Sequence, residues 1–149
     1  MPIGEFCNRE VVIADPATTV LEAAKLMRRH HVGCLVVVES LAGARRPVGV
    51  VTDRDLVIEV LAQEVAPEKL TVGDLIAGDV ATVGTGAGVF DTLHYMREHG
   101  CRRMPVVDDS GQVAGIVALD DYVGLFAEEL TELARLMAVE LDREGKQRP

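Results

Sequence analysis

The chain contains one pattern twice, and this duplication limits the folds that are open to it. The segment 26–30, LMRRH, recurs 69 residues later as the segment 95–99, YMREH, and an apolar run follows each copy. After these runs the offset between the copies falls to 66, because the first copy has a longer turn at residues 39–47. Two tandem copies build a pseudo-two-fold architecture, and the seam between them is a natural place for a cleft.

Composition excludes several classes of protein. The net charge is −9, with 24 acidic and 15 basic residues, which argues against general affinity for nucleic acid. Apolar residues make up 48% of the chain, yet no apolar stretch approaches the roughly 20 residues of a membrane span. The N-terminus has no charged segment followed by an apolar run, so no signal peptide is visible. Three cysteines without CxxC spacing favour a reduced, cytoplasmic protein.

Each copy reads as strand, helix, strand, strand, helix, an α/β (α+β) pattern. In the first copy, β-branched and apolar runs predict strands, and an i, i+3, i+4, i+7 apolar spacing predicts a helix capped by Thr18 or Thr19. That helix is expected to end at Gly33. The expected elements are strand 11–13, helix 20–32, strand 34–38, the turn 39–47, strand 48–51, and a helix from Asp53 to about Gln63.

A polar connector at 64–69 leads to the second copy. Its expected elements are a short helical turn at 72–76, strand 80–83, helix 89–98, strand 103–107 and strand 113–117. The glycine-rich loop 84–88 has no Lys-Ser/Thr after it, so a flexible turn is favoured over a phosphate cradle.

The last helix is expected to run from Leu119 to about Arg143. Its apolar stripe consists of Phe126, Leu130, Leu133, Met137 and Leu141. The stripe could pack back onto the same chain or associate with another copy. We favour self-association, because the stripe extends past the duplicated unit.

The segment 49–56, GVVTDRDL, carries the most chemistry. Thr52 and Asp55 have the spacing of a helix capping box, in which each side chain binds the backbone amide of the other residue. A hydroxyl and a carboxylate at a helix N-terminus can also bind the two hydroxyls of a ribose, and the helix end favours an attached phosphate. Spacing alone leaves both interpretations open.

The repeat, its tandem copy, the segment 49–55 and the segment 101–108, CRRMPVVD, together resemble a pair of CBS domains, named for cystathionine β-synthase. The resemblance covers about residues 2–127. It implies two repeats packed sheet to sheet as a Bateman module, with clefts for AMP, ADP, ATP, NAD or S-adenosylmethionine. It also implies that two modules pair into a homodimer. The predicted organisation is repeat 1 at 2–63, a linker at 64–71, repeat 2 at 72–127 and a helical extension at 128–149.

The resemblance assigns ribose binding to Thr52 and Asp55, and to Asp121 in the second copy. Ala118 stands where the second copy should have its hydroxyl, so the second cleft is expected to bind more weakly by about 0.5–1.5 kcal/mol. Arg102 and Arg103 match positions that reach ligand phosphates from the partner repeat. Because successive strand residues point to opposite faces, at most one of the two is expected in a given cleft, unless the strand is bulged.

Adenine needs an apolar slot, and the family pattern suggests Val12, Ile13, Val36 and Val37 for it, although each also suits the core. The histidines at helix ends and the three cysteines show no ligand spacing, so no metal site is expected. No catalytic set is visible. The expected function is therefore a cytoplasmic, non-enzymatic sensor of an adenosine compound, without an obligatory cofactor and with an unknown effector protein. The alternatives are an interaction module with empty clefts and, more remotely, a redox- or metal-responsive protein.

Overall fold

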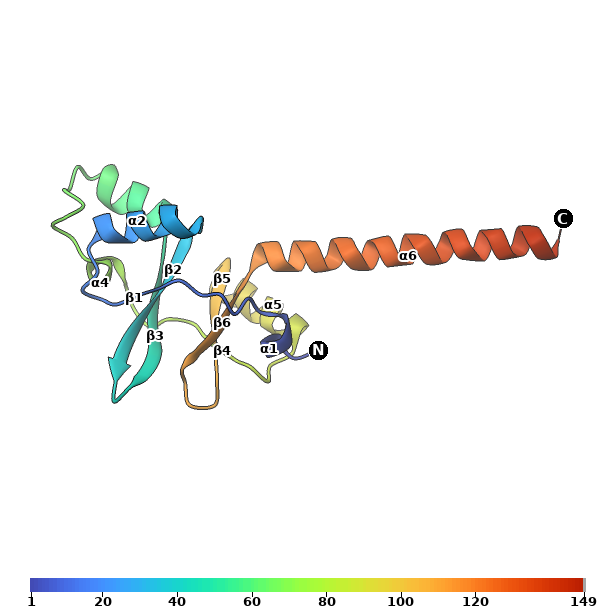
Figure 1. Cartoon of the computed structure of the whole chain (residues 1–149), viewed down its shortest axis with the longest axis horizontal. Helices are drawn as coiled ribbons and strands as arrows, with labels where there is room; N and C mark the ends of the chain where they lie inside the picture. The colour runs from blue at the N-terminus through green and yellow to red at the C-terminus, as the bar shows by residue number, and fades with distance from the viewer. Residues whose placement is uncertain (149) are drawn as a thin grey trace. The chain divides into compact units, whose positions relative to one another are not determined.

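Residues 1–148 are described by a computed structural model, and they form two compact units. The first unit is Met1–Val117, and the second begins at Ala118. The first unit contains two three-stranded sheets with strand orders β1-β2-β3 and β4-β5-β6 (Figure 1). This arrangement confirms the predicted α+β class with a duplicated unit.

The first sheet is built around a long hairpin. Strand β1 (Ile13–Ala14) runs parallel to β2 (Cys34–Leu41), which pairs antiparallel with β3 (Ala44–Thr52). The prediction of a long turn at 39–47 is wrong, because strand pairing continues to Leu41 and Ala44. Only Ala42 and Gly43 form the turn, with φ of 52° and 81°, the backbone that a two-residue hairpin turn requires.

The first long helix, α2 (Val20–His30), begins as the sequence predicts. Thr19 caps it, and Glu22 completes a capping box. Its buried face carries Val20, Ala23 and Met27. The helix ends earlier than expected, because His31 rather than Gly33 takes the left-handed backbone conformation that closes it.

Apart from α5, which has 11 residues like α2, the remaining elements of the first unit are short. The helix predicted from Asp53 divides into α3 (Asp53–Leu56) and a π-helical turn, η1 (Val57–Leu61). The others are α1 (Ile3–Phe6), α4 (Val72–Leu75), β4 (Val83–Gly84), α5 (Val89–His99), β5 (Arg103–Val107) and β6 (Val113–Ala118).

The opening segment of each repeat, which precedes its first strand (residues 2–12 and 72–82), lies against the other repeat. The amide of Ile3 donates to the carbonyl of Ala87, and the amide of Gly4 donates to the carbonyl of Thr85. Asn8 and Ile116 are joined by two backbone hydrogen bonds, one in each direction. Reciprocally, the amide of Val72 donates to the carbonyl of Thr18. The buried cluster around β2 accordingly contains Val72 from the second repeat. This exchange ties the two repeats into one unit.

Two glycines make the exchange possible. A Cβ at Gly49 would lie 2.6 Å from the Ile76 side chain, and a Cβ at Gly115 would lie 2.5 Å from Cys7 Sγ. The two glycines are equivalent in the duplicated sequence, as are Ile76 and Cys7. The edge strands β3 and β6 therefore carry no side chain at the point where the opening segment of the other repeat crosses them.

The second unit consists of the helix α6 (Leu119–Gln147), with Ala118 before it. It is four residues longer than the predicted end at Arg143. The predicted extension ends at Pro149, which lies outside the described residues. The predicted stripe is exposed along α6, from 42% at Phe126 to 68% at Leu141.

Candidate ligand cleft

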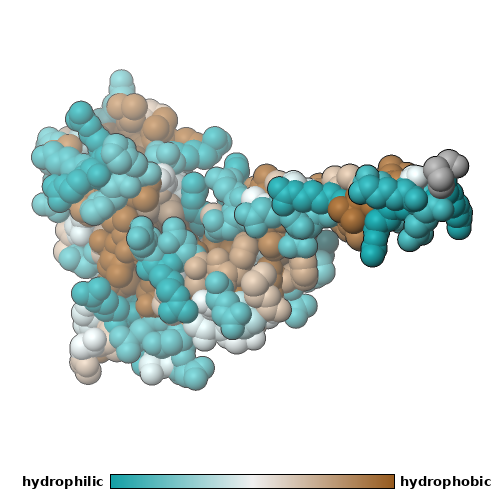
Figure 2. All heavy atoms as spheres, turned by 45° about the vertical axis from the view of Figure 1, so that its right-hand side comes forward, coloured by the Kyte–Doolittle hydropathy of each residue, from teal (hydrophilic) through white to brown (hydrophobic). Residues whose placement is uncertain are grey.

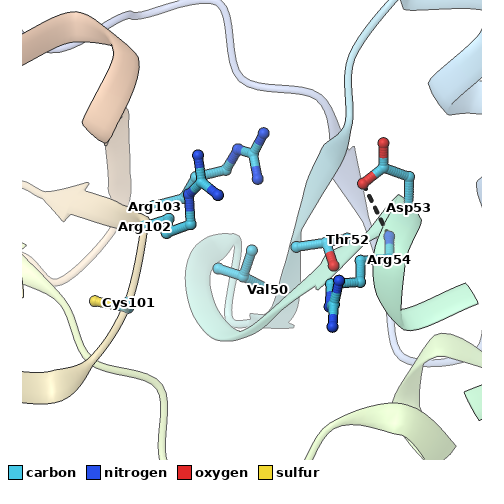
Figure 3. A pocket seen from close by; sticks show the side chains of 7 residues that line it. All are labelled: Val50, Thr52, Asp53, Arg54, Cys101, Arg102 and Arg103. Atoms are coloured by element: carbon cyan, nitrogen blue, oxygen red, sulfur yellow. Dashed lines mark hydrogen bonds between the residues drawn. The ribbon is translucent and has the colours of Figure 1, made fainter. Parts of the chain in front are cut away.

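A hollow of about 440 Å³ lies between the two repeats, in the size range of small-molecule sites. It is lined by Val50, Thr52, Asp53, Arg54, Cys101, Arg102 and Arg103. Figure 3 shows the two arginines of the second repeat on one side of the hollow, and Thr52 and Arg54 of the first repeat on the other. The structure therefore brings Thr52 together with Arg102 and Arg103, as the sequence predicts.

Thr52 and Asp55 form the capping box at the start of α3. The Thr52 amide donates to Asp55 Oδ2 over 2.8 Å, and the Asp55 amide donates to Thr52 Oγ1 over 3.2 Å. These bonds leave the hydroxyl proton of Thr52 and the second carboxylate oxygen, Oδ1, of Asp55 for other partners. Capping and ligand binding are therefore compatible at this pair.

Both arginines line the hollow, so the expectation that at most one would enter is wrong. Strand β5 begins at Arg103, and Arg102 precedes it, so the alternation of strand side chains does not apply to the two. Arg103 reaches across the seam, with Nη2 3.5 Å from where a Cβ would lie on Gly33. The same Cβ would lie 3.1 Å from Asp53 Oδ2, so glycine at this position leaves room chiefly for the Asp53 carboxylate.

The charge of this hollow is positive although the chain is acidic. Three guanidinium groups, from Arg54, Arg102 and Arg103, line it together with one carboxylate, that of Asp53. Arg54 is a lining residue that sequence reasoning missed, although it lies inside the segment 49–56. Such a concentration of guanidinium groups is suited to binding a phosphate.

Cys34 lies close to these charges. Burial raises the pKa of its thiol, the nearby Arg103 opposes this rise, and Asp53 adds to it. Burial also raises the pKa of Cys101, with an opposing backbone hydrogen bond and no contribution from Arg103. Raised pKa values are the opposite of what a reactive thiol needs.

A second hollow, of about 320 Å³, adjoins the first. It contains Asp55 and shares Val50 with the first hollow. Its other lining residues are Val48, Gly49, Leu75, Ile76, Ala77, Gly78, Asp79 and Val80. Residues 75–80 belong to the exchanged opening segment of the second repeat. No signal within the segment itself indicated that it would lie beside Asp55.

The four residues suggested for adenine lie elsewhere. Val36 and Val37 are fully buried in β2, and Val12 packs against the same core. Ile13 lines a different hollow, with Arg45 and Ser40. None of the four is among the residues that line the two hollows described above.

The second copy of the motif departs from the first. The Ala118 amide donates to Asp121 Oδ2 over 2.7 Å, which reproduces half of the capping box, but Ala118 has no hydroxyl. Gly33 and Cys34 stand at the positions that Arg102 and Arg103 occupy in the second copy. The duplicated motif is therefore chemically unequal in its two copies.

No three histidine, cysteine or acidic side chains among residues 1–148 come together as a metal site would require. Within the same residues, no helix has the length and apolarity to cross a membrane.

Comparison with known proteins identifies the repeat. Residues 3–62 and 72–128 each match the model of the CBS domain. An uncharacterised protein of Methanopyrus kandleri is 36% identical over 121 residues, which are 81% of this chain and 60% of that protein. The chain thus spans less than two thirds of that relative's length.

Two solved structures share the fold. A CBS domain protein from Pyrobaculum aerophilum, complexed with AMP, is 26% identical with a TM-score of 0.72, over 81% of this chain and 89% of that one. The CBS domain pair of MJ0100, in complex with 5′-methylthioadenosine and S-adenosyl-L-methionine, is 26% identical with a TM-score of 0.74. That match covers 87% of this chain and 98% of the other.

Proposed function

This chain belongs to the CBS-domain family, with two domains in tandem, and we propose that it is a regulatory module that binds an adenosine-containing ligand between its repeats. The observation that supports this proposal most directly is that one hollow is lined both by Thr52 of the first repeat and by Arg102 and Arg103 of the second. The solved relatives with AMP and with S-adenosyl-L-methionine support the ligand class. The module acts without catalysis and signals to an effector protein.

Thr52 and Asp55 bind the ribose. The hydroxyl proton of Thr52 and the free Oδ1 of Asp55 are directed to the sugar hydroxyls, while the capping bonds remain. Arg102 and Arg103 bind the phosphate with charge-assisted hydrogen bonds, and Arg54 adds to the positive potential. Adenine lies toward the second hollow, against Val50 and Ile76, rather than at the four core positions.

The arginines favour an anionic ligand. AMP, ADP, ATP and NAD carry phosphates, whereas S-adenosylmethionine carries a sulfonium cation and no phosphate. The hollow has three guanidinium groups and one carboxylate, so it attracts the phosphorylated compounds and repels the sulfonium cation. Among the adenosine compounds we therefore place the phosphorylated ones first.

Ligand binding in the hollow between the two repeats changes the position of one repeat relative to the other. A ligand that touches both repeats stabilises the arrangement in which both sets of contacts form, and the response is limited by its differential affinity for the two arrangements. Asp121 supports a second, weaker site, because Ala118 supplies no hydroxyl. We place the module in a homodimer, formed through the repeats and the last helix.

The competing function is an interaction module with empty clefts. The inequality of the two copies favours it. Ala118 lacks the hydroxyl that Thr52 has, and Gly33 and Cys34 lack the guanidinium groups of Arg102 and Arg103. A redox- or metal-responsive function is weaker, given the raised pKa values of Cys34 and Cys101.

Calorimetric titration with AMP separates ligand binding from helix capping. The variant is Asp55→Ala, and the matched control is Asp74→Ala. Asp74 completes an equivalent capping box with Thr71, at 2.9 and 3.3 Å, yet lines neither hollow. Both variants lose about 0.3–1.5 kcal/mol of stability, but only Asp55→Ala loses AMP binding. Equal AMP affinity in both variants would leave the Thr52–Asp55 pair as a cap alone.

A further inference from the structure

The first repeat carries a hollow that is separate from the ligand cleft. Its volume is about 400 Å³, within the size range of small-molecule sites, and it lies inside the first unit. Figure 2 shows apolar atoms bordered by polar ones on the surface of this unit, and the lining of the hollow is mixed in the same way. We call it the hairpin hollow, and its lining residues are Ile13, Ala14, Asp15, Thr18, Val38, Ser40 and Arg45.

The hairpin hollow exists because β1 ends before the strand beside it. The last residue of β1, Ala14, pairs with Val37, whereas β2 continues to Leu41. Among residues 1–148, the neighbours of β2 in the sheet are β1 and β3. Beyond Ala14, the side of β2 that faces β1 therefore has no strand next to it. Val38 and Ser40 of β2 border the space that is left.

The backbone of Ser40 faces this space. The Val36 amide donates to the carbonyl of Val12, on the β1 side, and alternate residues of a strand direct their backbone groups to the same side. The opposite strand agrees. Arg45 pairs with Ser40, and its amide donates to the side chain of Gln112 over 3.4 Å, away from β2. Two opposite residues of an antiparallel pair either bond each other or both face outward, so the Ser40 amide and carbonyl are available to a ligand.

Two opposite charges line the hairpin hollow without pairing with each other. Asp15 supplies a carboxylate and Arg45 supplies a guanidinium, yet both ion pairs found within residues 1–148 are on α6. Asp15 Oδ1 accepts a hydrogen bond from the amide of Ala17 over 2.8 Å, which leaves Oδ2 for another partner. The hollow therefore offers one anionic and one cationic group to the same ligand.

The second copy of the repeat lacks these groups. Gly84 and Ala87 stand at the positions that Asp15 and Thr18 occupy in the first copy. The hairpin of the second copy is also three residues shorter, because the offset between the copies falls from 69 to 66. Strand β4 and helix α5 form without a carboxylate or a hydroxyl at these positions. The repeat fold therefore does not require the polar set of the hairpin hollow.

We propose that the hairpin hollow binds a free α-amino acid with an aliphatic side chain. Asp15 Oδ2 and the Ser40 carbonyl accept hydrogen bonds from the ammonium group, while Arg45 and the Ser40 amide donate to the carboxylate. The aliphatic side chain lies against Val38 and Ile13. This site is independent of the nucleotide, because it shares no lining residue with the two hollows of the ligand cleft.

Titration with L-leucine, followed by the backbone amide resonances of isotope-labelled protein, tests the site. The Ser40 amide resonance should shift and saturate. N-acetyl-L-leucinamide has the same side chain but neither charge, so it should produce no comparable shift. Equal affinity for the blocked compound would indicate addition of a peptide strand to β2 and would overturn the proposal. An unchanged Ser40 amide resonance with leucine would overturn it as well.

Matched substitutions test the two charges. Arg45→Gln and Asp15→Asn should each raise the dissociation constant for L-leucine at least about tenfold, because each removes a charge-assisted hydrogen bond. Arg46→Gln is the control, since Arg46 is also exposed on β3 but lines neither the hairpin hollow nor the ligand cleft. Asp15 and Arg45 are exposed, so both variants should keep the wild-type spectrum elsewhere. The same dissociation constant in all three variants would refute recognition by charge.

Discussion

Arg103 is the residue whose charge should matter most to the ligand. Replacing it by Gln removes a charge-assisted hydrogen bond of about 1.5–3 kcal/mol, so AMP should bind roughly 10- to 150-fold more weakly. Arg46→Gln, on the exposed hairpin of the first sheet, is the control. Calorimetry should show the loss only for Arg103, and equal affinities would remove Arg103 from the phosphate site.

The same substitution should act on Cys34. Arg103 lowers the pKa of this thiol, so Arg103→Gln should raise that pKa further above its ordinary value. The pH profile of iodoacetamide alkylation at Cys34, followed by mass spectrometry, should therefore move to higher pH. Cys101 is the internal control, because Arg103 does not contribute to its pKa. A profile for Cys34 that does not move would place the guanidinium too far away to act.

The residues that line the two hollows were unevenly predictable from the sequence. Thr52, Asp55 and the two arginines could be predicted, because each lies in a short motif that occurs in order with the others. That Arg102 and Arg103 both line the same hollow could not be predicted, because it depends on the residue at which β5 begins. Residues 75–80 were missed because only the exchange of opening segments brings them beside Asp55.

Among the elements, the β2–β3 turn is open to a direct test. Gly43 has φ of 81° with open space around it, so Gly43→Ala should cost about 1 kcal/mol through backbone strain alone. Ala42, with φ of 52°, should respond in the opposite sense, and Ala42→Gly should stabilise by a few tenths to about 1 kcal/mol. Urea denaturation of both variants measures the change in the free energy of unfolding. Changes of the same sign in the two variants would contradict this turn conformation.

Element type was more predictable than element length. Helices α2 and α5 were placed well, because 3.6-residue periodicity and start signals agree there. The hairpin was underestimated, since Arg45, Arg46 and Pro47 suggest a loop while strand pairing continues through them. β1 has only two residues and begins two residues after its predicted start, because three β-branched residues do not fix a register.

At the scale of the whole molecule, the exchanged segments join the two repeats. Gly115→Ala would place a Cβ 2.5 Å from Cys7 Sγ and 2.8 Å from the Asn8 carbonyl oxygen, and should destabilise the chain by about 1–3 kcal/mol. Gly84→Ala is the control, since a Cβ there meets nothing within 4 Å. Thermal unfolding should give a lower melting temperature for Gly115→Ala than for Gly84→Ala. Similar melting temperatures would argue against a close approach of the opening segment at Gly115.

Ligand-dependent thermal unfolding of the whole chain tests the central claim most directly. A ligand at about 100 times its dissociation constant adds roughly 2.7 kcal/mol, on the order of 5–10 °C for a chain of this size. We expect such a shift with at least one of AMP, ADP, ATP and NAD, a smaller one with S-adenosylmethionine, and none in Asp55→Ala. No shift with any of the five compounds would contradict ligand sensing and favour an interaction module.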